Sequence, residues 1–224
     1  MRFFLVMMSI LGIGGFIMLN NTPNRAQNES DCPKPRIPYS EFWTLTDFCK
    51  TTVPISEIIS GGPPPDGIPP IDNPSFESIE LASAWLQPQS PVLVFEHNGI
   101  ARAYPLAIMT RHEIVNDEID DLPIAVTYCP LCNSGIVFER RMDDVTIRLG
   151  VSGLLRNSDM VMWDDVSQTW WQQFTGEGIV GQYAGETLTM LSSAMVGFGA
   201  FVEQYPEGEV LTRESGYGTN RYGS

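Results

Sequence analysis

Basic residues are scarce in this sequence of 224 residues. Its 13 Lys and Arg stand against 27 Asp and Glu, which gives a formal net charge of −14 at pH 7. Nucleic acids and anionic membrane surfaces are bound through basic patches, so this balance argues against both as partners. We expect membrane contact only through the N-terminal segment.

Several common functional signatures are also missing. The sequence has only two histidines, His97 and His112, and it shows no phosphate-binding glycine-rich loop, no internal repeat and no coiled coil. No Ser-His-acid triad can be assembled from these residues. The hydrophobic fraction of 43% and the aromatic fraction of 10% nevertheless indicate a globular protein.

The N-terminus reads as a targeting segment. After Arg2, residues 3–19 form an almost unbroken apolar run of 17 residues. That length lies on the border between a cleaved signal peptide and a membrane anchor. We expect residues 1–26 to be one of the two. The protein would then be exported, either periplasmic or extracellular, or anchored to the membrane by its N-terminus.

Export changes the interpretation of the four cysteines, because disulfides form in oxidising compartments. Cys32 and Cys49 lie in a polar, proline-punctuated segment over residues 27–54, ahead of a main domain over residues 55–224. The simplest pairing is a Cys32–Cys49 disulfide, which would be structural. Cys129 and Cys132 are left to each other or to a ligand.

Turn residues divide the chain into short apolar runs, which is typical of a β-rich protein. An Asn98-Gly99 turn predicts a hairpin of residues 91–96 and 100–104. The sequence predicts further strands over 114–119, 124–128, 136–140, 145–151 and 187–190, and helices over 78–86, 106–113 and 192–205. Residues 61–70 are too rich in proline for either, and we expect an extended loop packed on the domain through Ile68 and Ile71. The predicted fold is α+β and β-rich, a single domain of mostly antiparallel short strands with two or three short helices.

The most informative stretch is Cys129-Pro130-Leu131-Cys132, which joins two of the predicted strands. Two sulfurs on one turn can bind a soft metal, form a redox disulfide or remain inert. A thioredoxin-type pair opens a helix whose N-terminus lowers the thiol pKa. Here Asn133-Ser134-Gly135 leads into a β-type run instead, which disfavours that type of oxidoreductase.

His112 follows the predicted helix over 106–113 and precedes the cysteines by about one strand and turn. With Cys129 and Cys132 it predicts a soft-metal site of three protein ligands. Copper is the favoured ion, and zinc and iron are not excluded. Three ligands leave a coordination position open, which suits either an enzyme or a metal carrier.

Two further polar groups are candidates for the surroundings of this site. The first is Arg156, Asn157, Ser158 and Asp159, which lie between apolar residues. An internal Arg156–Asp159 ion pair is the favoured interpretation, and the alternative is that the tetrad faces the cysteine turn. The second contains Trp171, Gln172 and Gln173. It predicts with equal weight a ligand-binding groove or a strand with core tryptophans.

Six ordered blocks of this sequence resemble the signature blocks of domain-of-unknown-function family 3179, DUF3179, over roughly residues 55–222. The blocks cover residues 66–70, 101–106, 112–117, 126–132, 151–159 and 171–176. The resemblance implies an exported or membrane-anchored bacterial or archaeal protein, and it implies no activity. It places His112, Glu113, Cys129, Cys132 and the tetrad 156–159 at motif positions. Asn133 stands where the family pattern typically has glycine.

Three functional hypotheses follow from the residues. The first is an exported metal-binding protein of unknown activity that uses His112, Cys129 and Cys132. The second is a non-catalytic envelope binding or structural module with a Cys129–Cys132 disulfide. The third is an extracytoplasmic thiol oxidoreductase. In each of them the partner is a metal or a small ligand.

Overall fold

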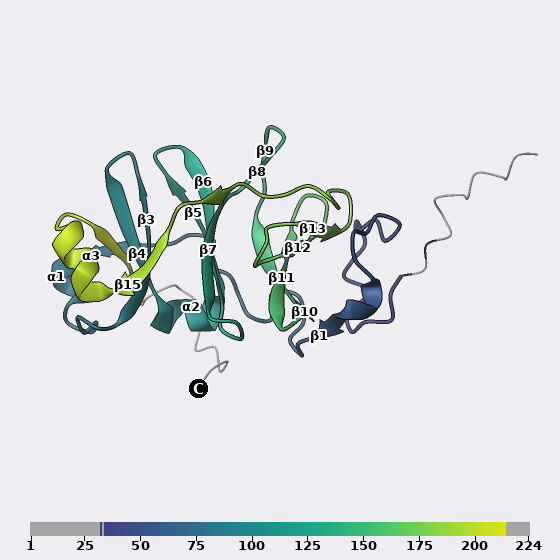
Figure 1. Cartoon of the computed structure of the whole chain (residues 1–224), viewed down its shortest axis with the longest axis horizontal. Coiled ribbons are helices and arrows are strands. Elements are labelled where there is room, and N and C mark those ends of the chain that lie inside the picture. Colours follow the sequence, from purple (N-terminus) through teal and green to yellow (C-terminus); the bar gives the residue numbers. More distant parts are fainter. Residues whose placement is uncertain (1–31, 33, 214–224) are drawn as a thin grey trace, which may run out of the picture. The chain divides into compact units, whose positions relative to one another are not determined.

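The computed structural model describes residues 32 and 34–213. The predicted signal peptide or anchor over residues 1–26 lies outside these residues. The described part contains 16 strands in several mainly antiparallel sheets and three short α-helices. The predicted β-rich α+β domain is therefore confirmed (Figure 1). No helix within the described ranges has the length and apolar character needed to span a membrane.

Three sheets make up most of the domain, and we call them sheets A, B and C. Sheet A has the order β1-β10-β11-β12-β13. Its strands are β1 (Ile58–Ser60), β10 (Leu149–Arg156), β11 (Asp159–Asp164), β12 (Trp170–Gln172) and β13 (Gly178–Val180). Sheet B has the order β14-β7-β6-β5. Its strands are β14 (Met190–Leu191), β7 (Ser134–Glu139), β6 (Leu122–Cys129) and β5 (Ile114–Ile119).

Sheet C has the order β15-β3-β4-β16-β2. Its strands are β15 (Ala194–Gly197), β3 (Pro91–His97), β4 (Ile100–Pro105), β16 (Glu209–Leu211) and β2 (Phe76–Ser78). The β4–β16 pair is parallel, whereas the other neighbours are antiparallel. The Asn98-Gly99 turn joins β3 to β4 as predicted. A separate ribbon consists of β8 (Arg141–Met142) and β9 (Val145–Thr146).

The α-helices are α1 (Ile79–Ala82), α2 (Leu106–His112) and α3 (Phe198–Gln204), and one 3₁₀ turn, η2, covers Ile55–Glu57. The helix predicted over residues 192–205 is wrong in its first half. There β15 pairs with β3 at the edge of sheet C, and this pairing overrides the local helical pattern. The strand predicted over 145–151 is also interrupted, since β9 ends at Thr146 and β10 begins at Leu149.

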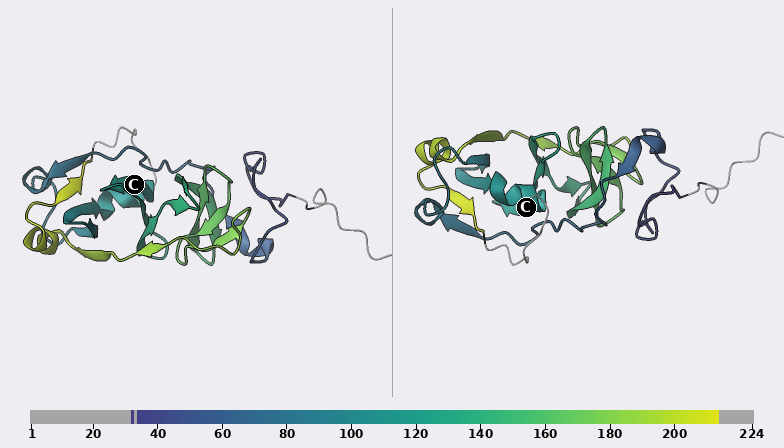
Figure 2. Two further views of the ribbon diagram at one scale, coloured as in Figure 1. Left: turned by 90° about the horizontal axis from the view of Figure 1, so that it is seen from above. Right: turned by 90° about the horizontal axis from the view of Figure 1, so that it is seen from below.

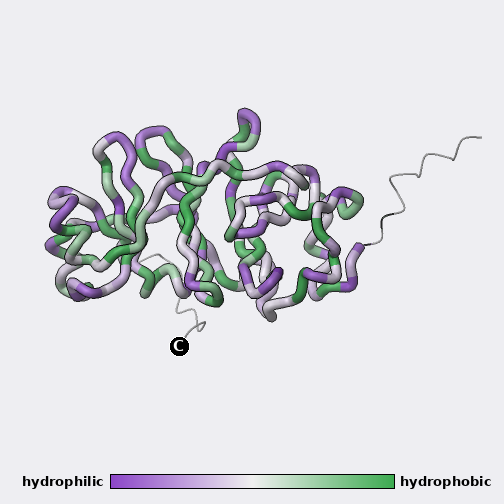
Figure 3. The backbone as a smooth tube through the Cα atoms, in the orientation of Figure 1, coloured by the Kyte–Doolittle hydropathy of each residue, from purple (hydrophilic) through white to green (hydrophobic). Residues whose placement is uncertain are grey.

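Two shared cores connect the sheets, with sheet B between the other two (Figures 1 and 2). Sheets B and C share one core, to which β6 contributes Val126 and β3 contributes Leu93. Sheets A and B share another, to which β7 contributes Phe138 and β11 contributes Met162. Hydrophilic residues gather at hairpin turns such as the β3–β4 turn (Figure 3).

Two segments outside the sheets are held against this framework. The predicted Cys32–Cys49 disulfide is present, and Trp43 from the same segment is buried beside Trp170. The proline-rich loop over residues 61–70 packs on the domain as predicted, since Ile68 and Ile71 are buried. This loop lies along β10 and forms one wall of the region described next.

Candidate functional site

Two hairpin turns from different sheets meet at the cysteines. In sheet B, Cys129 at the end of β6 pairs with Ser134 at the start of β7. Asn133 has φ 50°, a left-handed conformation that asparagine tolerates better than most residues. Asparagine in place of the glycine of the family pattern is therefore compatible with this turn.

The second turn joins β10 to β11 in sheet A. Arg156 pairs with Asp159, and the two residues between them, Asn157 and Ser158, have φ values of 53° and 64°. Two central residues with positive φ define the tight turn that suits a twisted hairpin. Asn157 and Ser158 are exposed and shape this turn, which places Asp159 at the first position of β11.

Cys129, Cys132 and Asp159 form the group of potential metal ligands that the described residues bring together. One ligand atom from each lies within 4.8 Å of the others. Cys132 Sγ lies 3.4 Å from Asp159 Oδ1, and the Cys129 thiol lies 4.0 Å from the carbonyl oxygen of Ser158. Both thiols are free, with Cys129 buried and Cys132 exposed. The exposed sulfur makes the group accessible from solvent.

His112 is not part of this group. It is buried at the end of α2, and its Nδ1 lies 2.8 Å from the carbonyl oxygen of Pro69 in the proline-rich loop. Burial lowers the pKa of this imidazole below its usual value. The ligand set expected from the sequence therefore does not come together with His112, and Asp159 stands beside the two sulfurs instead.

Asp159 is fixed by two donors from β12 and the residues after it. Its Oδ2 accepts hydrogen bonds from Gln172 Nε2 and, at 2.9 Å, from the backbone N–H of Phe174. The expected Arg156–Asp159 ion pair is wrong, because Arg156 Nη2 pairs with Glu57 Oε2 at 2.7 Å. The Arg156 guanidinium also donates to Gln172 Oε1 at 3.3 Å, which orients that amide toward Asp159.

A second chain of hydrogen bonds supports Cys132. Its Sγ lies 3.0 Å from Ser134 Oγ, and that hydroxyl donates to Gln173 Oε1 at 2.8 Å. Gln173 Nε2 in turn donates to Thr127 Oγ1 at 2.9 Å. Ser134 and Thr127 were not singled out from the sequence. A hydroxyl two positions after Cys132 is the signal that points to Ser134.

The glutamines lie near the cysteines, whereas the neighbouring tryptophan belongs to the core. Trp171 is fully buried between sheets A and B, and its Nε1 donates to Asp164 Oδ2 at 3.0 Å. Gln172 and Gln173 are also buried and hydrogen-bonded. The strand with core tryptophans is thus the arrangement present, and these residues do not line an open groove.

The two sulfurs have no cationic hydrogen-bond partner among the described residues. Burial raises the pKa of the Cys129 thiol to about 12. The groups that hydrogen-bond the two sulfurs within the described residues are backbone groups, the other cysteine, Ser134 and Asp159, and none is cationic. Two thiols and a carboxylate near one another can all ionise at neutral pH only when a cation joins them.

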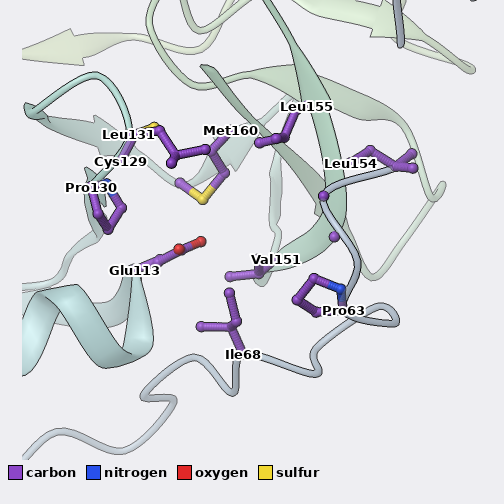
Figure 4. A pocket seen from close by; sticks show the side chains of 12 residues that line it. Pro63, Ile68, Glu113, Cys129, Pro130, Leu131, Val151, Leu154, Leu155 and Met160 are labelled. Atoms are coloured by element: carbon purple, nitrogen blue, oxygen red, sulfur yellow. The ribbon is translucent and has the colours of Figure 1, made fainter. Parts of the chain in front are cut away.

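Cys129 also borders a pocket of ≈ 40 Å³ that contains Glu113. The Glu113 side chain extends into this space toward Met160, opposite Ile68, Val151 and Pro63 (Figure 4). Glu113 follows α2 with φ 61°, a conformation that costs a non-glycine residue free energy. Burial raises the pKa of its carboxyl group to about 7.

The fold and the site define a β-rich domain in which two thiols and one carboxylate converge from two sheets. The family model described as "Protein of unknown function (DUF3179)" matches residues 65–224, and the chain belongs to this family. Searches of curated proteins and of solved structures give no match.

Proposed function

We propose that this protein is an exported metal-binding protein and that Cys129, Cys132 and Asp159 hold one soft or borderline transition-metal ion. The observation that carries the proposal is the convergence of three ionisable ligand atoms within 4.8 Å, none of which has a cationic hydrogen-bond partner among the described residues. A metal ion supplies the missing positive charge and replaces the protons of both thiols.

The ligand types narrow the choice of ion to Cu(I) and Zn(II). Two thiolates alone suit Cu(I), the ion favoured by the sequence. Zinc accepts thiolates and a carboxylate oxygen together, and three protein ligands leave its fourth position open. Asp159 can be used to distinguish the two ions experimentally, because zinc would use it as a ligand and Cu(I) would depend on the sulfurs.

Export is supported by two features of the N-terminal part of the sequence. The apolar run over residues 3–19 follows a basic residue. The Cys32–Cys49 disulfide is of the kind that persists in oxidising compartments. The thiol-oxidoreductase hypothesis has less support, since burial raises the pKa of Cys129 and no cationic group among the described residues hydrogen-bonds either sulfur to favour a reactive thiolate.

Metal analysis tests the proposal. The full-length chain, isolated from its export compartment, is expected to contain about one equivalent of copper or zinc and two free thiols. The Cys129→Ala/Cys132→Ala variant should contain none, whereas the matched Cys32→Ser/Cys49→Ser variant should keep it. Bound metal that survives loss of Cys129 and Cys132 would contradict the proposal.

The metal itself is identified with one further variant. In Asp159→Asn, zinc affinity should fall at least tenfold while Cu(I) affinity changes little, measured by competition with a chelator of known affinity. A metal-free protein with a Cys129–Cys132 disulfide would instead favour the envelope-module hypothesis.

A further inference from the structure

One acidic side chain near the cysteines has no partner among the described residues. Glu113 is 5% exposed, and its carboxylate makes no hydrogen bond or ion pair within residues 32 and 34–213; its oxygens are not fully enclosed by protein and face the pocket. Buried polar groups are nearly always hydrogen-bonded, because leaving one unpaired costs free energy. An unpaired carboxylate that faces a pocket therefore indicates a ligand that supplies hydrogen-bond donors.

The pocket around Glu113 is small and mostly apolar. It measures ≈ 40 Å³, which is room for about three water-sized groups. Figure 4 shows the carboxylate pointing between Met160 on one side and Ile68 and Val151 on the other. None of the described residues that line the pocket is basic. The walls suit a few aliphatic carbons, and the carboxylate suits a single cationic head.

The surrounding backbone keeps this pocket open. The proline-rich loop is tied to β10 by hydrogen bonds from Gly61 N to the carbonyl oxygen of Gly153, at 2.7 Å, and from Asp66 N to that of Val151, at 2.8 Å. Gly153 has φ 75°, and a Cβ there would collide with the carbonyl oxygen of Pro63. The loop is thus seated directly on the strand and cannot move inward to fill the space.

We propose that this pocket binds a small primary alkylammonium ion, with its ammonium group on the Glu113 carboxylate and its first carbons against Ile68, Val151 and Met160. An ammonium group brings three donors and the opposite charge. A nitrogen and two carbons match the number of groups that the pocket holds. The net charge of −14 also raises the local concentration of cations.

A metal ion is a poorer occupant of this pocket. Glu113 does not belong to the group of His, Cys, Asp and Glu ligand atoms that converge in the described part of the chain. A hard cation here would find one carboxylate among apolar walls and would have to lose much of its hydration. An alkylammonium ion needs only one acidic partner, so the site is complete for it.

The test titrates ethylammonium chloride into the full-length protein in the presence of a metal chelator, at constant chloride, and follows binding by ligand-observed NMR. We expect saturable binding, with ethanol of similar size and no charge binding at least tenfold more weakly. Glu113→Gln should lower the affinity for ethylammonium at least tenfold. Glu118→Gln, which removes an exposed acid outside the pocket, should leave it unchanged.

Two further variants keep the test decisive. Ile68→Phe fills the pocket while retaining the carboxylate, and it should also abolish binding. Cys132→Ala removes a proposed metal ligand that does not line the pocket, and it should bind ethylammonium normally, which separates this inference from the metal proposal. Absence of saturable binding, equal binding of ethanol, or unchanged binding by a folded Glu113→Gln protein would each overturn the inference.

Discussion

The two cysteine pairs of this chain have different surroundings. Cys32 and Cys49 are 17 positions apart and bonded, in a segment that packs on sheet A through Trp43. Cys129 and Cys132 are three positions apart and free, between a carboxylate and a hydroxyl. The first pair closes a loop of the chain, whereas the second presents ligand atoms. The neighbours of each sulfur, more than the spacing of the cysteines, separate a structural pair from a candidate binding pair.

Removing the disulfide should have the largest effect on stability and none on metal binding. Cross-linking two residues 17 positions apart restricts the unfolded chain, and for a loop of this size the contribution is about 3 kcal/mol. The Cys32→Ser/Cys49→Ser variant should lose about this free energy of unfolding in urea titrations. Its metal content should equal that of the unmodified protein. If this variant lost metal as well as stability, metal binding would depend on the disulfide. The two cysteine pairs would then not have separate roles.

Stability should depend on pH through Glu113, which lines the same pocket as Cys129. The pKa of Glu113 rises from 4.5 to about 7 in the folded protein, because burial penalises its charged form. The folded state then binds the proton more tightly than the unfolded state. This contribution is fully present below pH 4.5 and is lost as the pH rises through about 7. Between about pH 5 and pH 8 it amounts to about 2.5 kcal/mol.

Urea unfolding of metal-free protein at these two pH values measures that loss. Glu113→Gln has no titrating group at this position. Its loss of unfolding free energy over the same pH interval should therefore be smaller than that of the unmodified protein by about 2.5 kcal/mol. Glu118→Gln is the matched control, because it removes an exposed acid from the adjacent strand β5. Parallel pH profiles for all three proteins would show that Glu113 does not carry the dependence.

Much of the fold could be predicted because local signals agree with the tertiary structure. Asn98-Gly99 predicts the β3–β4 hairpin, and Ile68 and Ile71 predict that a proline-rich loop is packed. The helix over residues 192–205 failed in its first half, since the pairing of β15 with β3 depends on residues about a hundred positions away. Pairing across such distances leaves no periodic signal in the chain.

The candidate site could be predicted only in part, for the same reason. Cys129 and Cys132 are visible as a motif within one turn. Asp159 approaches them only because a turn of sheet A meets a turn of sheet B, and spacing along the chain does not reveal that contact. His112 is nearer in sequence, but its Nδ1 lies against the carbonyl oxygen of Pro69 and it is outside the group of Cys129, Cys132 and Asp159, so proximity along the chain does not predict which residue lies beside the sulfurs.

The smallest predicted effect concerns Ser134. Its hydroxyl lies beside one of the free cysteines, and it is not one of the proposed metal ligands. This hydroxyl lies 3.0 Å from Cys132 Sγ and 2.8 Å from Gln173 Oε1, so it can donate to the Cys132 thiolate once a metal ion has replaced the thiol proton. Groups that orient a ligand typically contribute tenfold or somewhat more to metal affinity. Ser134→Ala should therefore weaken metal binding about tenfold, or about 1.4 kcal/mol, while one equivalent still binds at saturation.

Ser56→Ala provides the control for that measurement, because Ser56 is an exposed hydroxyl on the 3₁₀ turn η2, outside the group of potential ligands. Competition with a chelator gives both affinities under one set of conditions. A loss confined to Ser134→Ala would show that the Ser134 hydroxyl positions the exposed sulfur. Equal affinities would mean that Asp159 and the turn itself hold Cys132 in place, since its sulfur also contacts Asp159, the Cys129 thiol and the carbonyl oxygen of Cys129.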